Sequence, residues 1–240
     1  MPLPSRVDPF GELFAAPARG LLMGNRGGRI HDAHRQLGAR RWASKQWICC
    51  RLDFKDRHRT VWGDGYTELF FLDEVTAFAA GHRPCFECRR KDAERFAALF
   101  AGVDPSSARP RESGDPVLDS RKGEPTLAIQ RAMRGNERRV GQRNRASAPA
   151  MDKVLHAERL DHKTKRSHVR AIGALPDGAM IVLEGAAFAV RGDMLLRWTP
   201  SGYTEQVSRP RAETAAVLTP PSILTALQRG YRPLWHSSAG

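Results

Sequence analysis

The segment "TELFFLDEVTAFAAGHRPCFECRR", residues 67–90, predicts a strand, a helix and a turn in succession. The run at 67–72 is mostly aliphatic and aromatic and predicts a strand. The alanine-rich run at 73–80 predicts a short helix with Asp73 at its N-cap, where a carboxylate accepts hydrogen bonds from free backbone N–H groups. Gly81 is expected to end this helix, because glycine readily takes the left-handed conformation that follows a helix C-terminus.

The ending Gly-His-Arg-Pro at 81–84 is echoed by Gly-Tyr-Arg-Pro at 230–233. The later copy lies within a predicted final helix at 220–233, for which Ser222 is the expected N-cap. No cysteine follows the later copy. The shared residues therefore indicate a way of ending a helix, and the chemistry specific to the first copy lies in the Cys-x-x-Cys that follows it.

The chain has four cysteines, with Cys49 and Cys50 adjacent and Cys85 and Cys88 in the Cys-x-x-Cys. Disulfides are rare in a reducing compartment, so this pattern favours metal ligands, and zinc takes four sulfur or nitrogen ligands in a tetrahedron. We therefore expect one Zn²⁺ bound by all four thiolates. Neighbours in a strand point to opposite faces, so the adjacent pair reaches one ion only if the strand bulges or ends there. A histidine is the alternative source of the fourth ligand. The candidates are His31, His34, His58 and His82.

Other segments of the N-terminal half predict further regular structure. "WICCRLDF" at 47–54 alternates with a period of two, which predicts a half-buried strand whose even-numbered residues form the apolar face. A short helix is expected around 31–38 and a returning strand at 60–62. Apolar residues at helical spacing predict helices at 87–101 and 151–160.

The fold class expected from this order of elements is α+β. Residues 1–103 form a zinc-knuckle region of short strands and helices. Residues 104–149 are rich in Pro, Gly, Ser and Arg without periodicity, which is typical of a disordered or inserted loop. Part of this loop resembles the translated interspersed palindromic elements found in some bacterial reading frames. Residues 150–240 predict a helix and a β-meander, with strands broken at Gly185 and Gly192 and packed on the first region.

The charge of the chain points to polyanionic partners. It carries 39 Lys and Arg against 26 Asp and Glu, a formal net charge of +13. Nucleic acid is the expected partner, with DNA favoured over RNA and no membrane. The residues expected to contact it are Arg40, Arg41, Arg83, Arg89, Arg90 and Lys91. The N-terminus lacks the pattern of a secretory signal, and no apolar run approaches the roughly 20 residues of a membrane span, so a cytoplasmic protein is expected.

Residues 67–90 resemble the second half of the Ada-type metal-binding domain. The shared pattern is an aromatic strand, an acidic and alanine-rich helix, and Gly-aromatic-Arg-Pro-Cys-x-x-Cys followed by basic residues. In that family four cysteines bind one zinc, and one of the upstream pair accepts a methyl group from a DNA phosphotriester. The resemblance implies that Cys85 and Cys88 are zinc ligands. This sequence departs from the pattern in its adjacent upstream cysteines and in having His82 where the family has another aromatic residue.

The functional expectation is a zinc-binding, nucleic-acid-associated protein with a structural metal. One alternative is a zinc-dependent enzyme acting on nucleic acid by methyl transfer to cysteine, nuclease or nucleobase deaminase chemistry. A deaminase uses Pro-Cys-x-x-Cys together with an upstream His-x-Glu or Cys-x-Glu, and no such triplet precedes Cys85. Another alternative is a basic metal-binding adaptor. A thioredoxin-type redox pair fits less well, because the strand, helix and turn do not follow the βαβ order of that fold.

Overall fold

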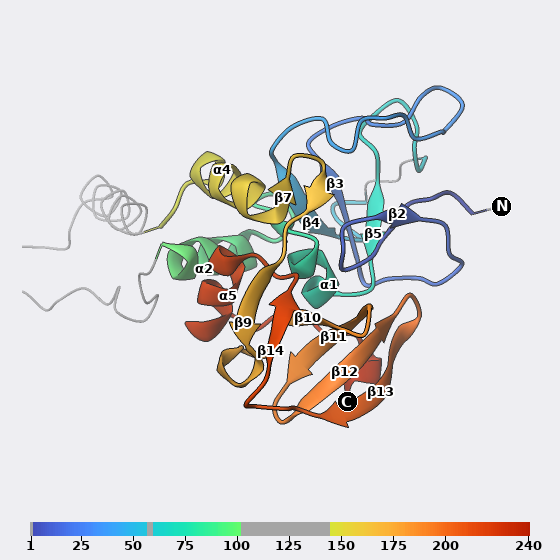
Figure 1. The fold of residues 1–240 in the computed structure, drawn as a ribbon. Coiled ribbons are helices and arrows are strands. Elements are labelled where there is room, and N and C mark those ends of the chain that lie inside the picture. The colour runs from blue at the N-terminus through green and yellow to red at the C-terminus, as the bar shows by residue number, and fades with distance from the viewer. Residues whose placement is uncertain (1, 57–59, 102–144) are drawn as a thin grey trace, which may run out of the picture.

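The computed structural model describes residues 2–56, 60–101 and 145–240. Helices and strands are mixed in it, which confirms the expected α+β class (Figure 1). The helices are α1 (Glu74–Ala79), α2 (Arg90–Phe100), α4 (Ala148–Arg159) and α5 (Pro221–Gln228), and short 3-10 helices lie at Ile172–Ala174 and Ser237–Ala239.

The first sheet is formed by the N-terminal part of the chain. Its strands are β1 (Arg6–Val7), β2 (Leu13–Phe14), β3 (Leu22–Arg26), β4 (Trp47–Arg51), β5 (Leu69–Phe71) and β6 (Arg83–Pro84). They lie in the order β2-β1-β5-β3-β4-β6. The pairings β1–β5 and β4–β6 are parallel, and the others are antiparallel. The parallel pairing of β4 with β6 matters most, because it places the adjacent cysteines beside the Cys-x-x-Cys.

The second sheet is formed by the C-terminal part of the chain. Its strands are β9 (His168–Ala171), β10 (Met180–Leu183), β11 (Ala186–Arg191), β12 (Met194–Thr199), β13 (Gly202–Ser208) and β14 (Thr214–Val217). They lie in the order β13-β12-β11-β10-β14-β9, and every pairing is antiparallel. A small hairpin of β7 (Leu160–Asp161) and β8 (Thr164–Lys165) follows α4 directly. The predicted meander is therefore present, with turns at Gly185 and Gly192.

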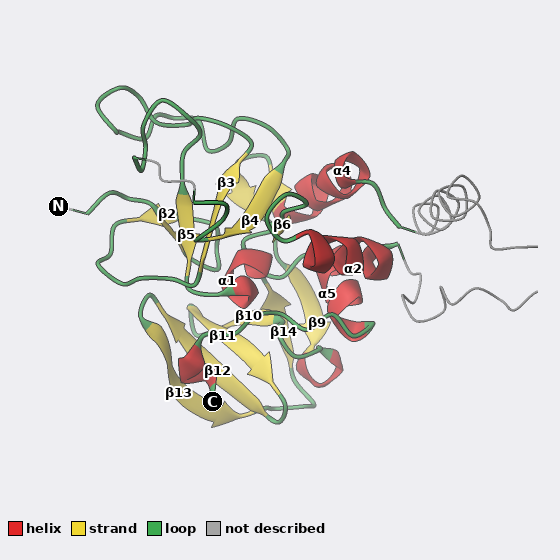
Figure 2. Ribbon diagram, turned by 180° about the vertical axis from the view of Figure 1, so that it is seen from behind, coloured by secondary structure: helices red, strands yellow, loops and turns green. Residues whose placement is uncertain are grey.

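Helix α1 lies between the two sheets, with α2, α4 and α5 to one side (Figures 1 and 2). All its residues are buried, so it has no solvent face, as expected of a helix that packs on every side. Ala77 joins the apolar cluster of the first sheet, and Val75 joins that of the second. Phe78 joins a third cluster with the other helices. At its start, the side chain of Asp73 accepts a hydrogen bond from the N–H of Thr76 at 2.9 Å, as the predicted N-cap.

The two Gly-aromatic-Arg-Pro segments end α1 and α5 in the same way. Gly81 has φ 83° and Gly230 has φ 97°, both in the left-handed region. After α1, the N–H of His82 donates to the carbonyl of Ala77 at 2.9 Å, and the N–H of Tyr231 makes the equivalent bond to Ala226 after α5 at 3.0 Å. These are the bonds of a Schellman motif, and the predicted helix ends are confirmed.

Three sequence-based expectations about local structure are wrong. Residues 31–38 form no helix, because the side chain of Asp32 accepts hydrogen bonds from the N–H groups of His34 and Gln36 and holds a turn instead. Residues 60–62 form a turn, since the N–H and the indole N–H of Trp62 both donate to Glu68.

Ser222 is the third case, since it lies inside α5 and does not cap it. The helix starts at Pro221 with Pro220 at the N-cap. The hydroxyl of Ser222 donates instead to the carboxylate of Glu158 at 2.6 Å, and its N–H donates to the same carboxylate at 3.0 Å. This contact joins α5 to the C-terminal end of α4.

The predicted strand at 47–54 is present as β4, with its faces reversed from the expectation. Trp47 and Cys49 point into the core and are 2% and 0% exposed, whereas Ile48 and Cys50 are only partly buried. Both faces of β4 carry apolar side chains, and the face that packs against α1 forms the interior. The consequence is that Cys50 lies on the outer face of the first sheet.

The predicted loop at 104–149 falls almost wholly outside the described residues, which resume at 145, and α4 begins at Ala148. Within the part of the chain that the structure describes, no helix is both long enough and apolar enough to cross a membrane.

Candidate metal centre

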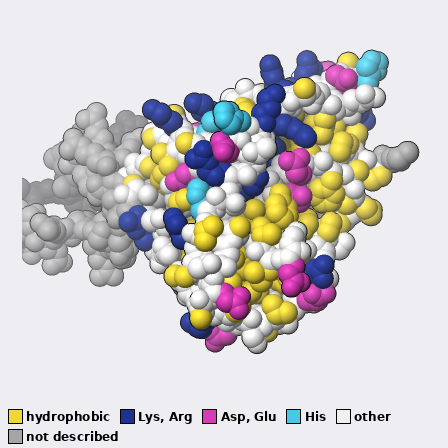
Figure 3. Space-filling model, viewed as in Figure 1, with side chains coloured by type: hydrophobic (Ala, Val, Ile, Leu, Met, Phe, Trp, Pro, Cys, Tyr) yellow, Lys and Arg dark blue, Asp and Glu magenta, His cyan; other side chains and the backbone are white. Residues whose placement is uncertain are grey.

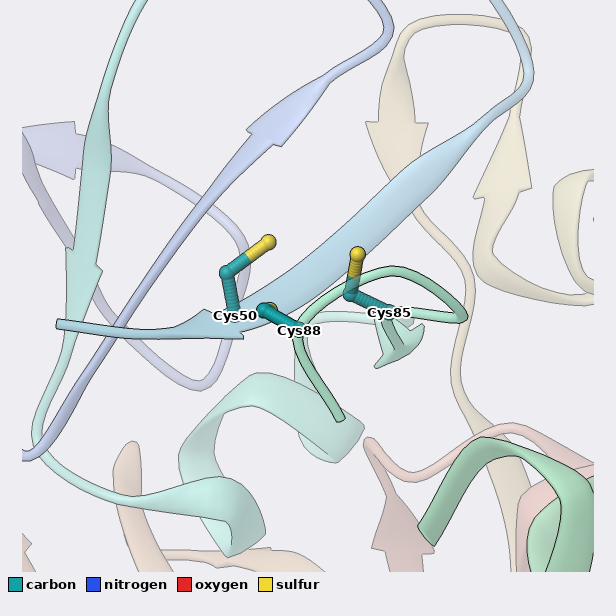
Figure 4. Close-up of side chains that lie close together, drawn as sticks. All are labelled: Cys50, Cys85 and Cys88. Atoms are coloured by element: carbon teal, nitrogen blue, oxygen red, sulfur yellow. The ribbon is translucent and has the colours of Figure 1, made fainter. Parts of the chain in front are cut away.

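Three cysteines meet at the edge of the first sheet. Cys50 comes from β4, Cys85 follows β6, and Cys88 lies in the turn before α2. Their sulfur atoms all lie within 4.8 Å of one another, and Figure 4 shows Cys50 on its strand facing the turn that carries the other two. Two thiolates on one tetrahedral zinc are about 3.8 Å apart, given Zn–S bonds of about 2.3 Å. The cluster is therefore compact enough to hold a metal ion, and zinc suits its sulfur ligands.

Main-chain pairing fixes this geometry. In the β4–β6 register, Cys49 is opposite Pro84, and the N–H of Cys85 donates to the carbonyl of Cys49 at 3.0 Å. The turn then closes as the N–H of Arg89 donates to the carbonyl of Cys85 at 3.0 Å. Because these are main-chain bonds, the positions of Cys50 and Cys85 follow directly from the sheet pairing.

Hydrogen bonds to sulfur favour one thiolate in the cluster, at Cys85, whereas the same contacts and burial raise the pKa of Cys50. The thiols of Cys50 and Cys88 and the N–H of Glu87 all donate to Cys85 and hold its pKa well below the usual range of a thiol. The N–H of Arg51 donates to the sulfur of Cys88 at 3.4 Å. The site thus already stabilises a thiolate, which is the form of cysteine that binds metal.

Cys49 does not join the cluster. Its side chain points to the opposite face of β4, where it packs with Leu22, Leu69 and Phe71 and is fully buried. Burial raises the pKa of its thiol, and the guanidinium of Arg89 donates to its sulfur at 3.4 Å. The expected four-cysteine site is therefore corrected to three cysteines, because β4 runs through both residues without the bulge that would turn them to one side.

The candidate histidine ligands lie elsewhere. His82 is fully buried between Trp47 and Phe71, with ring centroids 5.0 and 4.6 Å away. His31 stacks on Trp62 and shares a 2.7 Å hydrogen bond with Thr67. His34 is exposed. His58 lies outside the described residues. Among the residues that the structure describes, the metal-ligand cluster contains cysteines only.

A cavity of about 280 Å³ adjoins the cluster on the outer face of the first sheet. All three cysteines line it, so a metal held by them would border this space. Cross-strand neighbours supply its floor, as Met23 pairs with both Cys50 and Phe70. The remaining lining residues are Asn25, Ile48, Arg51, Leu52, Phe54, Val61, Tyr66, Glu68 and Glu87.

Glu68 is the functional candidate that sequence reasoning missed. It is 4% exposed and lines the cavity, and one carboxylate oxygen accepts a hydrogen bond from the N–H of Trp62 at 2.8 Å. A buried carboxylate beside a cavity is a group that can exchange protons there. The available signal was an acid immediately before an apolar strand, two residues from Phe70, which lines the same cavity.

The basic residues expected to contact nucleic acid divide into two groups. Arg83 and Arg89 are buried, and they form ion pairs with Asp152 and Glu74 at 2.8 and 2.7 Å. Neither guanidinium is therefore free to meet a phosphate backbone, which corrects that expectation. The charged residues that remain exposed are Arg40, Arg41, Arg90 and Lys91.

Basic residues are also among those that line a larger cavity, which shares Arg51, Leu52, Glu87 and Cys88 with the first. This cavity of about 790 Å³ is bordered by Cys88, and its lining is mixed in charge. The cations that line it are Arg51, Arg89, Arg90, Lys91, Arg95 and Arg232, and the acids are Asp53, Glu74, Glu87 and Asp92. Arg90 and Lys91 thus lie next to the cysteine turn, as the sequence order implies.

No protein-family model, curated protein sequence or solved structure matches the chain. The function proposed below accordingly rests on the cysteine geometry and the surfaces beside it.

Proposed function

We propose that the protein binds one Zn²⁺ through the thiolates of Cys50, Cys85 and Cys88. The observation that carries this proposal is the approach of the three sulfurs to within 4.8 Å of one another. Zinc is the metal best suited to a sulfur-only site in a folded domain. Three thiolates carry more negative charge than one Zn²⁺ neutralises. The main-chain N–H groups that donate to the sulfurs would offset part of this excess charge.

We propose further that the fourth coordination position is exchangeable, in place of the structural metal expected from the sequence. Structural zinc sites use four protein ligands, whereas catalytic sites use three and leave one position for water or substrate. The described residues supply three, and all three border the 280 Å³ cavity. A zinc ion there would act as a Lewis acid on a group in the cavity, and Glu68 is the carboxylate placed to hold or release a proton.

Metal stoichiometry tests the ligand set. We expect the purified protein to hold one zinc per chain and the variants Cys50→Ser, Cys85→Ser and Cys88→Ser to lose it. Cys49→Ala is the matched control, because Cys49 adjoins Cys50 but faces the core. Retention of zinc by Cys85→Ser, or its loss in a folded Cys49→Ala variant, would contradict the proposed ligands.

Cobalt substitution tests the open position. The Co²⁺-loaded protein should show sulfur-to-cobalt charge-transfer absorption, and added imidazole should shift its visible bands by taking the fourth position. An unchanged spectrum at saturating imidazole would mean a closed, structural site. Glu68→Gln serves as a control that alters the cavity without removing a ligand, and it should still bind cobalt.

Association with nucleic acid is the wider function that we propose for this zinc protein. The supporting observations are the net charge of +13 and the exposed Arg90 and Lys91 beside the cysteine turn. Binding should weaken steeply as salt rises, because phosphate contacts release counterions. Arg90→Gln combined with Lys91→Gln should reduce the affinity for DNA, while Arg197→Gln on the second sheet should leave it unchanged. Salt-independent binding, or equal affinity in all variants, would favour a protein-binding adaptor instead. Parallel titrations with RNA test the expected preference for DNA.

A further inference from the structure

Three buried or half-buried cations converge on the inner side of the first sheet, away from the metal centre. Arg26 comes from the end of β3, Arg159 from the end of α4 and Lys165 from β8. The two arginines are 2% and 0% exposed. Both pack on the ring of Trp47, with guanidinium carbons 4.0 and 3.9 Å from its centroid. This ring holds the two guanidinium groups in fixed positions.

These cations lack the carboxylate partners that other buried arginines of the protein have. Among the described residues, no carboxylate lies within ion-pair distance of any of the three, in contrast to Arg83 with Asp152 and Arg89 with Glu74. Their side-chain donors reach main-chain oxygens instead, and Nη2 of Arg159 also lies 3.2 Å from Nδ1 of His156. The main-chain acceptors are the carbonyl oxygens of Gly11 and Arg41 for Arg26, of Gly81 and Lys45 for Arg159, and of Ala79 for Lys165. Burying several unpaired like charges is costly, so this arrangement calls for a negative group.

The electrostatics of the cluster agree with its geometry. Burial, with the positive charge of Arg159 and Arg26 nearby, lowers the pKa of Lys165 to about 7. Burial and the charge of Arg26 lower the pKa of Arg159 to about 8. The two guanidinium groups therefore disfavour the charged form of Lys165, and Arg26 disfavours that of Arg159. A bound anion would reverse this effect.

The three side chains line a small cavity. Its volume is about 20 Å³, which exceeds the roughly 10–15 Å³ that one water needs and restricts any occupant to a small ion or the end group of a larger molecule. The Nε atoms of Arg26 and Arg159 are buried without a hydrogen-bond partner in the described structure. Arg41, Lys163 and Glu12 also line the cavity and are exposed, and Arg41 forms an ion pair with Glu12 at 3.5 Å. Figure 3 shows Lys and Arg side chains gathered on this part of the surface, above β7.

We propose that this cavity is a binding site for a single phosphate group, held by Arg26, Arg159 and Lys165. A tetrahedral oxyanion offers acceptor atoms in several directions, which suits donors that converge from three separate elements. Guanidinium groups favour phosphate through charge-assisted hydrogen bonds. The group is either free inorganic phosphate or the terminal phosphate of a nucleotide or nucleic acid whose remainder stays outside.

Thermal unfolding in sodium phosphate tests the site, with sodium chloride at equal ionic strength as reference. Phosphate should raise the unfolding temperature in a saturable way, because it binds only the folded state, and chloride should not. Lys165→Met should lose at least tenfold in phosphate affinity while remaining folded, since the change removes a repelled charge. Lys153→Met, which removes an exposed cation elsewhere on α4, should respond like the wild type. Lys163→Met gives a second test at the rim and should weaken phosphate severalfold.

A 5′-phosphorylated oligonucleotide and its unphosphorylated twin separate the two sources of the group. Saturable stabilisation by inorganic phosphate alone identifies the free anion. A response to the phosphorylated oligonucleotide that Lys165→Met abolishes and Lys153→Met keeps identifies a terminal phosphate. If neither ligand acts beyond the chloride control, or if Lys165→Met responds as strongly as the wild type, the proposal is overturned.

Discussion

Arg83 donates to both carboxylate oxygens of Asp152, with Nε–Oδ1 and Nη2–Oδ2 distances of 2.8 Å, although the two residues are 69 positions apart. Arg83 belongs to β6, two residues before Cys85, and Asp152 belongs to α4. The segment 102–144 separates these elements in the sequence. A buried, bidentate ion pair therefore joins the strand that leads into the cysteine turn to α4, which follows that segment in the sequence.

Removing one partner of this pair should be strongly destabilising. Asp152→Asn leaves the buried charge of Arg83 uncompensated, and we expect a loss of about 3–5 kcal/mol in the free energy of unfolding. Asp193→Asn is the control, because its ion pair with Arg211 is exposed and such pairs contribute about 1 kcal/mol or less. Urea denaturation measures both. Equal, small effects would show that the Arg83–Asp152 pair contributes little.

Metal removal should destabilise the protein in a way that depends on the three clustered cysteines. Zinc binding to thiolates is coupled to folding, so a chelator should lower the unfolding temperature of the wild type and of Cys49→Ala alike. Cys88→Ser should already unfold at the lower temperature and should not respond to the chelator. Calorimetry with and without chelator gives the comparison, and a chelator-insensitive wild type would count against a bound metal.

The two helix-ending glycines form a matched pair for mutation. Gly230→Ala places a side chain at φ 97° with no atom within 4 Å of the new Cβ, so only the backbone cost of about 1–2 kcal/mol is expected. Gly81→Ala adds contacts of 2.6 and 2.8 Å with the side chain of Arg159. Its loss in unfolding free energy should be at least twice as large. Chemical denaturation of both variants measures these losses. Equal losses for Gly81→Ala and Gly230→Ala would contradict the prediction.

Stability should depend on pH through Lys165 in phosphate-free buffer. Its pKa is about 7 in the folded protein against an ordinary value of 10.5, so the unfolded chain binds more protons between these two values. Stability therefore rises with pH across this window. Sulfate should counter the trend, since it favours the charged amine. Unfolding temperatures of the wild type and Lys165→Met at pH 7 to 9.5 measure the effect, and parallel curves would rule out this titration.

The segment around α1 could be predicted from sequence because its signals are local. The N-cap at Asp73 and the ending at Gly81 depend on residues within a few positions, and both are present. The role of Cys85 and Cys88 as neighbours in one turn is similarly local. Cys50 was also an expected ligand and lies beside them, whereas Cys49, expected in the same site, packs in the core.

Interactions between distant residues could not be predicted in the same way. Alternation did not identify the inner face of β4, because Ile48 and Cys50 are as apolar as Trp47 and Cys49, and contact with α1 decides between them. Arg83 looked like a surface cation because its partner Asp152 lies 69 residues away.

The complete enclosure of α1 has a consequence for dividing the chain. Val75 packs in the apolar cluster of the second sheet and Ala77 in that of the first. The part of the chain on either side of 102–144 therefore lacks a complete hydrophobic core by itself. A fragment ending near Ala101 and another beginning near Arg145 should each remain unfolded alone. When mixed, the two fragments should associate and fold into a native-like complex. The chain could then be divided between them to make a split reporter.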